Sequence, residues 1–122
     1  MLTKSQLIQF TMEHPPTCML GRSPKVQSDY EKFMKKDCNR GDFVACMKER
    51  LEYKKFYFVQ NDFPYHTVDG IEHWVCWYGK DSKPEDFIQE IKEKKEIITY
   101  WKNYSQNMSI QEINHIHVFI QK

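Results

Sequence analysis

The sequence predicts an α+β domain with a mainly antiparallel sheet, helices packed on one side of it and a helical N-terminal half. Two observations support this class. Apolar residues recur at helical spacing through most of the chain up to Tyr53, whereas later segments rich in aromatic and β-branched residues alternate as strands do. Two of these strand segments follow one another across a short loop, which favours antiparallel pairing.

The first helix is predicted by a capping box. Thr3 and Gln6 stand three positions apart, so the Thr3 hydroxyl can accept an N–H of the first turn while Gln6 reaches back to the start. The helix should run to about His14, where two prolines follow. We assign residues 1–20 to this helix and a linker, and residues 21–122 to the remainder of one domain, because this length suits a single hydrophobic core.

Two longer helices are expected next. Ser23 and Pro24 are favoured at a helix N-cap and at the first helical position, so a helix should start there and end at Gly41. Asp42 should cap a third helix, whose apolar spacing continues to about Tyr53. Basic residues outnumber acidic ones through this region, so a surface that attracts anions should lie toward the helical half.

Strands and one further helix are expected in the second half. The predicted segments are the strand Phe56–Val59, the strand Ile71–Tyr78, a helix opened by a capping box at Ser82–Glu85, the strand Ile97–Trp101 and the strand Asn114–Lys122. Period-two alternation in the second strand places His73, Val75 and Trp77 on one face of the sheet.

The last strand carries the most informative pattern. Alternation sends His115, His117 and Phe119 to one face and three aliphatic residues to the other. Because histidine titrates near neutral pH, a strand-held pair suits a nucleophile, an acid–base group or two metal ligands. It also suits plain packing, in which the imidazoles bond backbone carbonyls or each other. We expect His73 to join His115 and His117 in one shared pocket.

Composition argues against several classes of protein. A formal net charge of +1, from 18 basic and 17 acidic residues, disfavours a general nucleic-acid coat or a membrane-surface protein. No apolar run approaches the ~18 residues that span a bilayer, and the N-terminus lacks a leader pattern. The four cysteines are scattered without a C-x-x-C pair. We therefore expect reduced thiols, no structural zinc, no cofactor and a cytoplasmic location.

Five short motifs resemble those of the fungal N-acetylglucosamine-induced protein family, a domain of unknown function. The motifs are Arg22-Ser23, Asn61–Tyr65, Gly70–Val75, Trp101–Asn103 and His115–Val118. They occur in the family's order over roughly Gly21 to Ile120. The resemblance implies family membership and brings no activity with it.

A more distant resemblance is to the histidine-triad (HIT) superfamily of nucleotide hydrolases and transferases, whose last strand carries H-φ-H-φ-H or H-x-H-x-Q. It implies a HIT-like fold in which His117, the middle histidine, attacks a phosphate to form a nucleotidyl-histidine, with His115 beside it. His73 would correspond to the histidine after the proline loop. Asn103 would correspond to the asparagine of the preceding strand, and Ser109 to the hydroxyl that contacts phosphate.

The sequence departs from the HIT pattern in three respects. Phe119 stands in the third position, where it cannot bond the leaving oxygen. The spacing from Ser109 to His115 is longer than in the superfamily. No glycine lies just before Ser109 to bring backbone N–H groups close to a phosphate. The resemblance therefore implies a HIT-like scaffold with slow or lost hydrolysis.

Three functions stay open at this point. The first is binding of a nucleotide or another phosphorylated small molecule, with slow hydrolysis through His117 assisted by His73, Arg22 and Lys80. The second is a three-histidine metal site, which ranks lower because no carboxylate stands ready to support the ligands. The third is a non-catalytic binding or interaction protein that uses its aromatic side chains. Arg22, at a turn before a helix, should face the same cleft and bind an anion, and a homodimer is left open.

Overall fold

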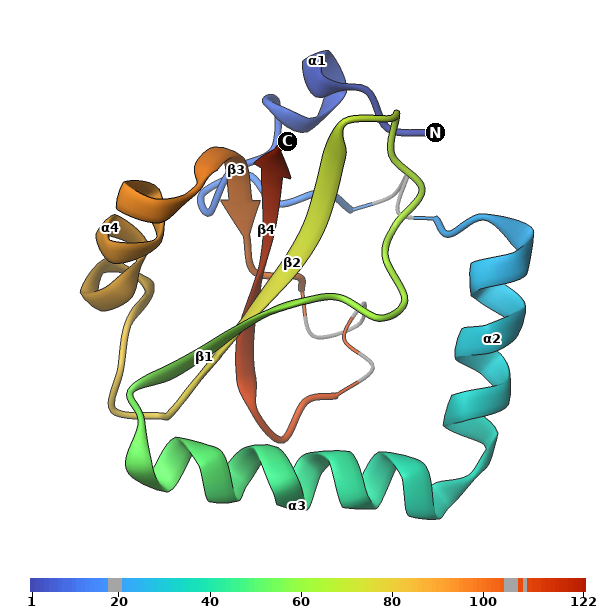
Figure 1. The fold of residues 1–122 in the computed structure, drawn as a ribbon, viewed down its shortest axis with the longest axis vertical. Coiled ribbons are helices and arrows are strands. Elements are labelled where there is room, and N and C mark those ends of the chain that lie inside the picture. The colour runs from blue at the N-terminus through green and yellow to red at the C-terminus, as the bar shows by residue number, and fades with distance from the viewer. Residues whose placement is uncertain (18–20, 105–107, 109) are drawn as a thin grey trace.

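The structure is a computed structural model that describes residues 1–17, 21–104, 108 and 110–122. Within these residues the chain forms four helices and four strands (Figure 1). In chain order they are α1 Lys4–Leu7, α2 Pro24–Lys35, α3 Asp37–Tyr53, β1 Phe56–Gln60, β2 Ile71–Tyr78, α4 Pro84–Lys94, β3 Glu96–Trp101 and β4 Asn114–Gln121. None of the described helices has the length and hydropathy needed to cross a membrane.

The strands form one antiparallel sheet in the order β1-β2-β4-β3. β2 and β4, the two histidine-bearing strands, are its central pair, and their register sets Val75 opposite His117 and Trp77 opposite His115. On its other side β4 pairs with β3, where Trp101 lies opposite His117. The predicted α+β class with an antiparallel sheet is confirmed, and the histidines lie at the centre of the sheet.

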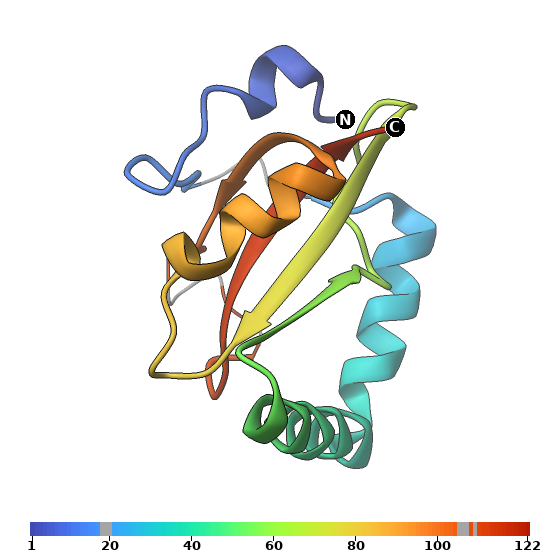
Figure 2. The same ribbon diagram turned by 60° about the vertical axis from the view of Figure 1, so that its left-hand side comes forward.

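Helices cover both faces of this sheet, so the expectation that they pack on one side is wrong. α4 packs on the face that carries Ile116, Val118 and Ile120. α3 packs on the opposite face, against Val75 and Trp77. Figure 2 shows the sheet between α4 and the α2–α3 pair. The reason is that β4 is buried on both faces along nearly its whole length, so each face needs a cover.

α1 is shorter than the sequence predicts. Its capping box forms as expected, with the Gln6 N–H donating to the Thr3 hydroxyl and the Thr3 N–H donating to the Gln6 side chain. The helix nevertheless ends at Leu7, well before His14. The carbonyl of Phe10 accepts the Thr99 hydroxyl of β3, so tertiary contacts hold the following residues out of the helix.

The boundary between α2 and α3 also differs from the prediction. Ser23 caps α2 as expected, but the break falls at Lys36, and the expected boundary at Gly41 and Asp42 lies inside α3. The side chain of Asn39 donates to the carbonyl of Phe33 at the end of α2. This bond satisfies a helix-end carbonyl, so the turn forms without a glycine.

The N-cap of α4 lies one residue later than the predicted capping box at Ser82. The carboxylate of Asp86 accepts the N–H of Lys83 at 2.9 Å, so Lys83 and Asp86 take the places expected for Ser82 and Glu85. All four strands lie within one residue of their predicted bounds.

Candidate functional site

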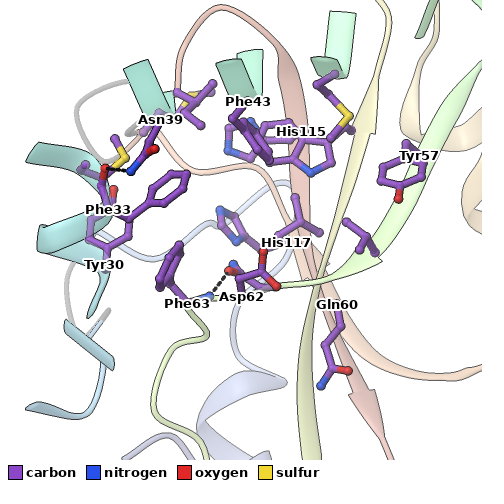
Figure 3. Close-up of a pocket in the computed structure, with 18 of the residues that line it drawn as sticks. Tyr30, Phe33, Asn39, Phe43, Tyr57, Gln60, Asp62, Phe63, His115 and His117 are labelled. Carbon is purple, nitrogen blue, oxygen red and sulfur yellow. Dashed lines mark hydrogen bonds between the residues drawn. The ribbon is translucent and has the colours of Figure 1, made fainter. Parts of the chain in front are cut away.

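A cavity of about 540 Å³ opens on the histidine face of the sheet, beneath α2 and α3 (Figure 3). Its wall combines aromatic side chains with polar ones, which include Arg22, Asn103, the two β4 histidines and further Asp, Asn, Gln and Arg side chains. The aromatic lining residues are Tyr30, Phe33, Phe43, Tyr57, Phe63, Tyr65 and Trp77. His115 and His117 project from β4 toward the aromatic side chains of the helices (Figure 3).

His73 and His117 are in direct contact across the central strands. His73 Nε2 lies 2.7 Å from His117 Nδ1, and both side chains are buried. His117 lines the cavity, whereas His73 lies behind it with its ring stacked on Phe119 at 4.6 Å. The three histidines therefore share one face of the sheet, but the expectation of one shared pocket is wrong for His73, because Phe119 and Tyr65 enclose it.

The hydrogen bonds of this pair fix the positions of its protons. The backbone N–H of Tyr65 donates to His73 Nδ1 at 3.0 Å, so a neutral His73 carries its proton on Nε2. That proton points at His117 Nδ1, which therefore accepts it. A neutral His117 must then carry its own proton on Nε2.

The Nε2 proton of His117 faces a second donor. Asn103 Nδ2 lies 3.1 Å from His117 Nε2 and also donates to the Tyr65 hydroxyl. The orientation of the Asn103 amide follows from Trp101, whose indole N–H can only donate and bonds Asn103 Oδ1 at 2.8 Å. Among the described residues no acceptor therefore serves the Nε2–H of His117. An oxygen atom of a ligand in the cavity would supply one.

Burial keeps these imidazoles neutral. Removal from water, followed by the positive charge of Arg22 and the proximity of His115, lowers the pKa of His73 to about 3. The pKa of His117 lies well below its usual value, again chiefly through burial. Burial also lowers the pKa of His115, although its bond to the Ile113 carbonyl acts in the opposite direction. At neutral pH each ring thus offers one N–H and one lone pair.

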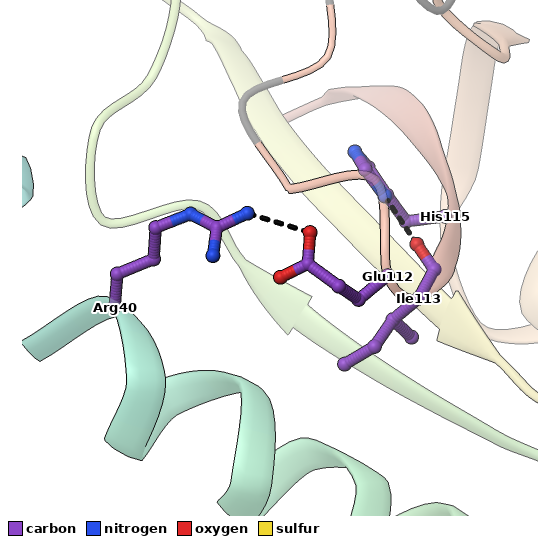
Figure 4. A network of polar contacts seen from close by, with 4 residues as sticks. All are labelled: Arg40, Glu112, Ile113 and His115. Carbon is purple, nitrogen blue, oxygen red and sulfur yellow. Dashed lines mark hydrogen bonds and ion pairs between the residues drawn. The ribbon is translucent and has the colours of Figure 1, made fainter. Parts of the chain in front are cut away.

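His115 has the opposite tautomer to His117. Its Nδ1 lies 3.0 Å from the carbonyl oxygen of Ile113, which can only accept, so the proton is on Nδ1 and the lone pair is on Nε2 (Figure 4). Next to Ile113, the Glu112 carboxylate accepts a hydrogen bond from Arg40 of α3 at 2.6 Å. This ion pair ties the segment just before β4 to α3.

Arg22 lies at the turn before α2, as predicted, and lines the cavity. Its Nε donates to the carbonyl of Phe63 at 2.7 Å, and its guanidinium lies over the rings of Tyr30 and Tyr65, 4.0 and 5.2 Å from their centroids. Within the described part of the chain, no carboxylate pairs with Arg22, and no residue accepts from its two terminal nitrogens. The guanidinium is therefore held in place with its outer donors available.

Of the remaining residues predicted for the site, one lies in the cavity and one does not. Asn103 lines the cavity as expected, whereas Lys80 is exposed in the turn after β2 and takes no part in the lining. The five strand positions from His73 to Tyr78, the end of β2, span roughly 17 Å, and Lys80 lies beyond them, so it is too far from His73 to assist there. Ser109 lies outside the described residues.

The three-histidine metal site is not formed. The facing nitrogens of His73 and His117 bond each other, and the described residues contain no group of three His, Cys, Asp or Glu side chains placed to hold a metal ion. Cys46 and Cys76 are free thiols. The other two predicted thiols, Cys18 and the side chain of Cys38, lie outside the description.

Sequence reasoning missed the part played by Tyr65. Its N–H sets the tautomer of His73, and its hydroxyl accepts from Asn103. The loop that delivers it starts with an Asx turn, in which Asn61 Oδ1 accepts the N–H of Phe63 at 2.8 Å. The Asn61–Tyr65 motif was a usable signal, but it identified a loop without identifying a role.

Comparison with known proteins supports the fold. No protein-family model matches the chain, and no curated protein matches it. The chain is similar to a solved structure described as the crystal structure of HTC1, with a TM-score of 0.62, 19% sequence identity and coverage of 84% of this chain and 76% of that one. At this identity the similarity shows the α+β fold alone. The resemblances to the N-acetylglucosamine-induced and HIT families stay predictions.

Proposed function

We propose that the cavity binds a nucleotide or another phosphorylated small molecule, with the phosphate between Arg22 and His117. One observation carries the proposal: both side chains line the cavity, and both have N–H donors that lack an acceptor among the described residues. Buried or half-buried donors without partners cost free energy, and a phosphate group brings several acceptor oxygens at once.

Arg22 is the group that would attract an anion, because the other charges around the cavity offset one another. The exposed carboxylates of Asp42 and Asp62 also line the cavity and offset the charge of Arg50. Arg22 is half-buried between aromatic rings, where the surrounding water is reduced and a charge-assisted hydrogen bond is stronger than on the open surface. A planar guanidinium with two free nitrogens also matches two phosphate oxygens.

Hydrolysis through His117 is a second element of the proposal. To act as a nucleophile, His117 needs a lone pair at Nε2. The hydrogen bonds of His73 and His117 instead put an N–H at His117 Nε2. Phe119 in the third position is buried and adds no polar group to the cavity. We therefore place binding first and expect any hydrolysis to be slow. We also propose that the protein works in a reducing compartment, the cytoplasm, and does not bind nucleic acid in general. A homodimer is left open.

Replacing Arg22 by alanine should weaken binding of a nucleoside monophosphate by roughly 1.5–3 kcal/mol, the usual contribution of a hydrogen bond to a charged group. Titration calorimetry measures this directly. Arg22→Lys should recover only part of the loss, because lysine keeps the charge without the bond to the Phe63 carbonyl.

Lys80→Ala is the matched control for this experiment. It removes a positive charge that is exposed and lies outside the cavity, so its dissociation constant should equal that of the wild type. An Arg22→Ala variant that binds as tightly as the wild type would return Arg22 to a purely structural role and remove the basis of the proposal.

A further inference from the structure

Two buried polar atoms of the cavity are unused by the residues that the structure describes. His115 is 6% exposed, and its Nε2 has a lone pair without a donor. Trp77 is 7% exposed, and no described residue accepts its indole N–H. The other two tryptophans differ, because Trp101 donates to Asn103 and Trp74 donates to Glu72. A buried indole N–H ordinarily finds a partner, so its absence at Trp77 needs an explanation.

The unused donor and the unused acceptor lie side by side. Trp77 and His115 are register partners on β2 and β4, and their ring centroids lie 4.4 Å apart with the ring planes tilted by 35°. Central strands hold both rings, and the ring of Phe43 packs edge-on against Trp77 at 5.1 Å. The surroundings are otherwise apolar, with Met47 and Val75 in the same cluster. A rigid donor–acceptor pair thus stands in an apolar aromatic wall.

We propose that Trp77 and His115 bind a planar heterocycle of the ligand, one that carries an N–H donor next to a carbonyl or ring-nitrogen acceptor. The ring N–H donates to His115 Nε2, and the neighbouring acceptor receives the Trp77 indole N–H. This inference rests on the proposed function, since the phosphate of the same molecule binds at Arg22 and His117. The ligand class is therefore a phosphorylated molecule whose other end is a flat, hydrogen-bonding ring.

Three features of the site favour a flat ring over a sugar or an aliphatic chain. The wall near Trp77 offers aromatic side chains, which pack well on a planar ring. At Trp77 and His115 the buried polar atoms without a partner among the described residues are one donor and one acceptor, which match a ring edge more closely than the several hydroxyls of a sugar. The imidazole centres of His115 and His117 are only 5.5 Å apart, so the ring end and the phosphate end belong to one continuous site.

Calorimetry with two matched pairs of ligands tests this inference. Uridine 5′-monophosphate is compared with its N3-methyl derivative, and adenosine 5′-monophosphate with purine riboside 5′-monophosphate. In each pair the phosphate and ribose are unchanged and the ring donor is removed. We expect the unblocked member of at least one pair to bind about tenfold more tightly or better. His115→Phe should abolish that difference, because His115 accepts the donor that distinguishes the two members. Trp77→Phe should weaken binding of both members of a pair, because both keep the acceptor that receives the indole N–H, and Arg22→Ala should also weaken both members equally.

The controls separate failure of this inference from failure of the proposed function. Trp74→Phe, on the opposite face of the sheet, should leave all affinities unchanged. Equal binding within both pairs, a difference that survives His115→Phe, or unchanged binding of both members to Trp77→Phe overturns the ring-binding role while leaving Arg22-dependent phosphate binding intact. If neither the nucleotides nor inorganic phosphate bind the wild type, the proposed function fails and this inference fails with it. Trp77→Phe keeps an aromatic ring, so the test does not depend on the folding of one variant.

Discussion

Replacing Phe119 by alanine should lower the free energy of unfolding by about 3–5 kcal/mol, the usual cost of truncating a buried phenylalanine. Its side chain is fully buried, and its ring stacks on Trp101 at 4.7 Å and on His73 at 4.6 Å. Both neighbours belong to strands that pair with β4, so the sheet cannot close over the cavity left by the lost ring. Urea unfolding of the two proteins measures the difference.

Tyr53→Ala is the control, because this ring is 83% exposed at the end of α3 and its loss should change stability by no more than about 0.5 kcal/mol. A loss below about 1 kcal/mol for Phe119→Ala would contradict the packing described above.

The same surroundings determine the expected result for Phe119→His. Stacked rings would leave an imidazole N–H without an acceptor, so we expect this variant to be destabilised by about 1–3 kcal/mol and not to complete a triad.

Acidification should destabilise the fold steeply between pH 6.5 and pH 4. An unfolded histidine has a pKa near 6.5, whereas the folded chain holds the pKa of His73 at about 3 and that of His117 well below 6.5. In this window the unfolded chain binds more protons than the folded one, so stability falls as the pH falls, by roughly 1.4 kcal/mol per pH unit for each residue. Above about pH 6.5 both states are neutral and this slope disappears.

Urea unfolding at successive pH values measures this slope. His73→Gln should reduce it by about one histidine's share, because glutamine can still accept the Tyr65 N–H but does not titrate. His66→Gln is the matched control, since that imidazole is exposed, and it should leave the slope unchanged. Stability that is independent of pH across this window would show that the two imidazoles are not held neutral by burial.

Local pattern accounts for the strands and fails at the helix boundaries. Alternation and the flanking turn residues placed every strand within one residue, because those signals reside in the strand itself. The end of α1 depends on a bond between Phe10 and Thr99, and the break after α2 depends on Asn39. The first of these is a contact between residues far apart in the chain, and the second is a side-chain bond that no propensity scale encodes.

The site was predictable in outline from the alternation of β2 and β4, which puts all three histidines on one face. That two of them bond each other was not predictable, because the contact depends on the β2–β4 register, which sets Val75 opposite His117. The roles of Tyr65 and Trp77 in the site could not be predicted for a different reason. Aromatic residues in a small domain mostly pack in the core, and only the structure shows the unused indole N–H of Trp77.

Long-range nitrogen–proton correlation NMR of the imidazole rings at pH 7 tests the central claim most directly. The claim is that His117 presents an N–H, and His115 a lone pair, to a cavity that needs a ligand with acceptor oxygens. The predicted result is the Nε2–H tautomer for His117 and the Nδ1–H tautomer for His115, with the His117 Nε2 signal shifting when a nucleoside monophosphate is added. The Nδ1–H tautomer at His117 would put a lone pair toward Asn103, satisfy that amide without any ligand and contradict the account.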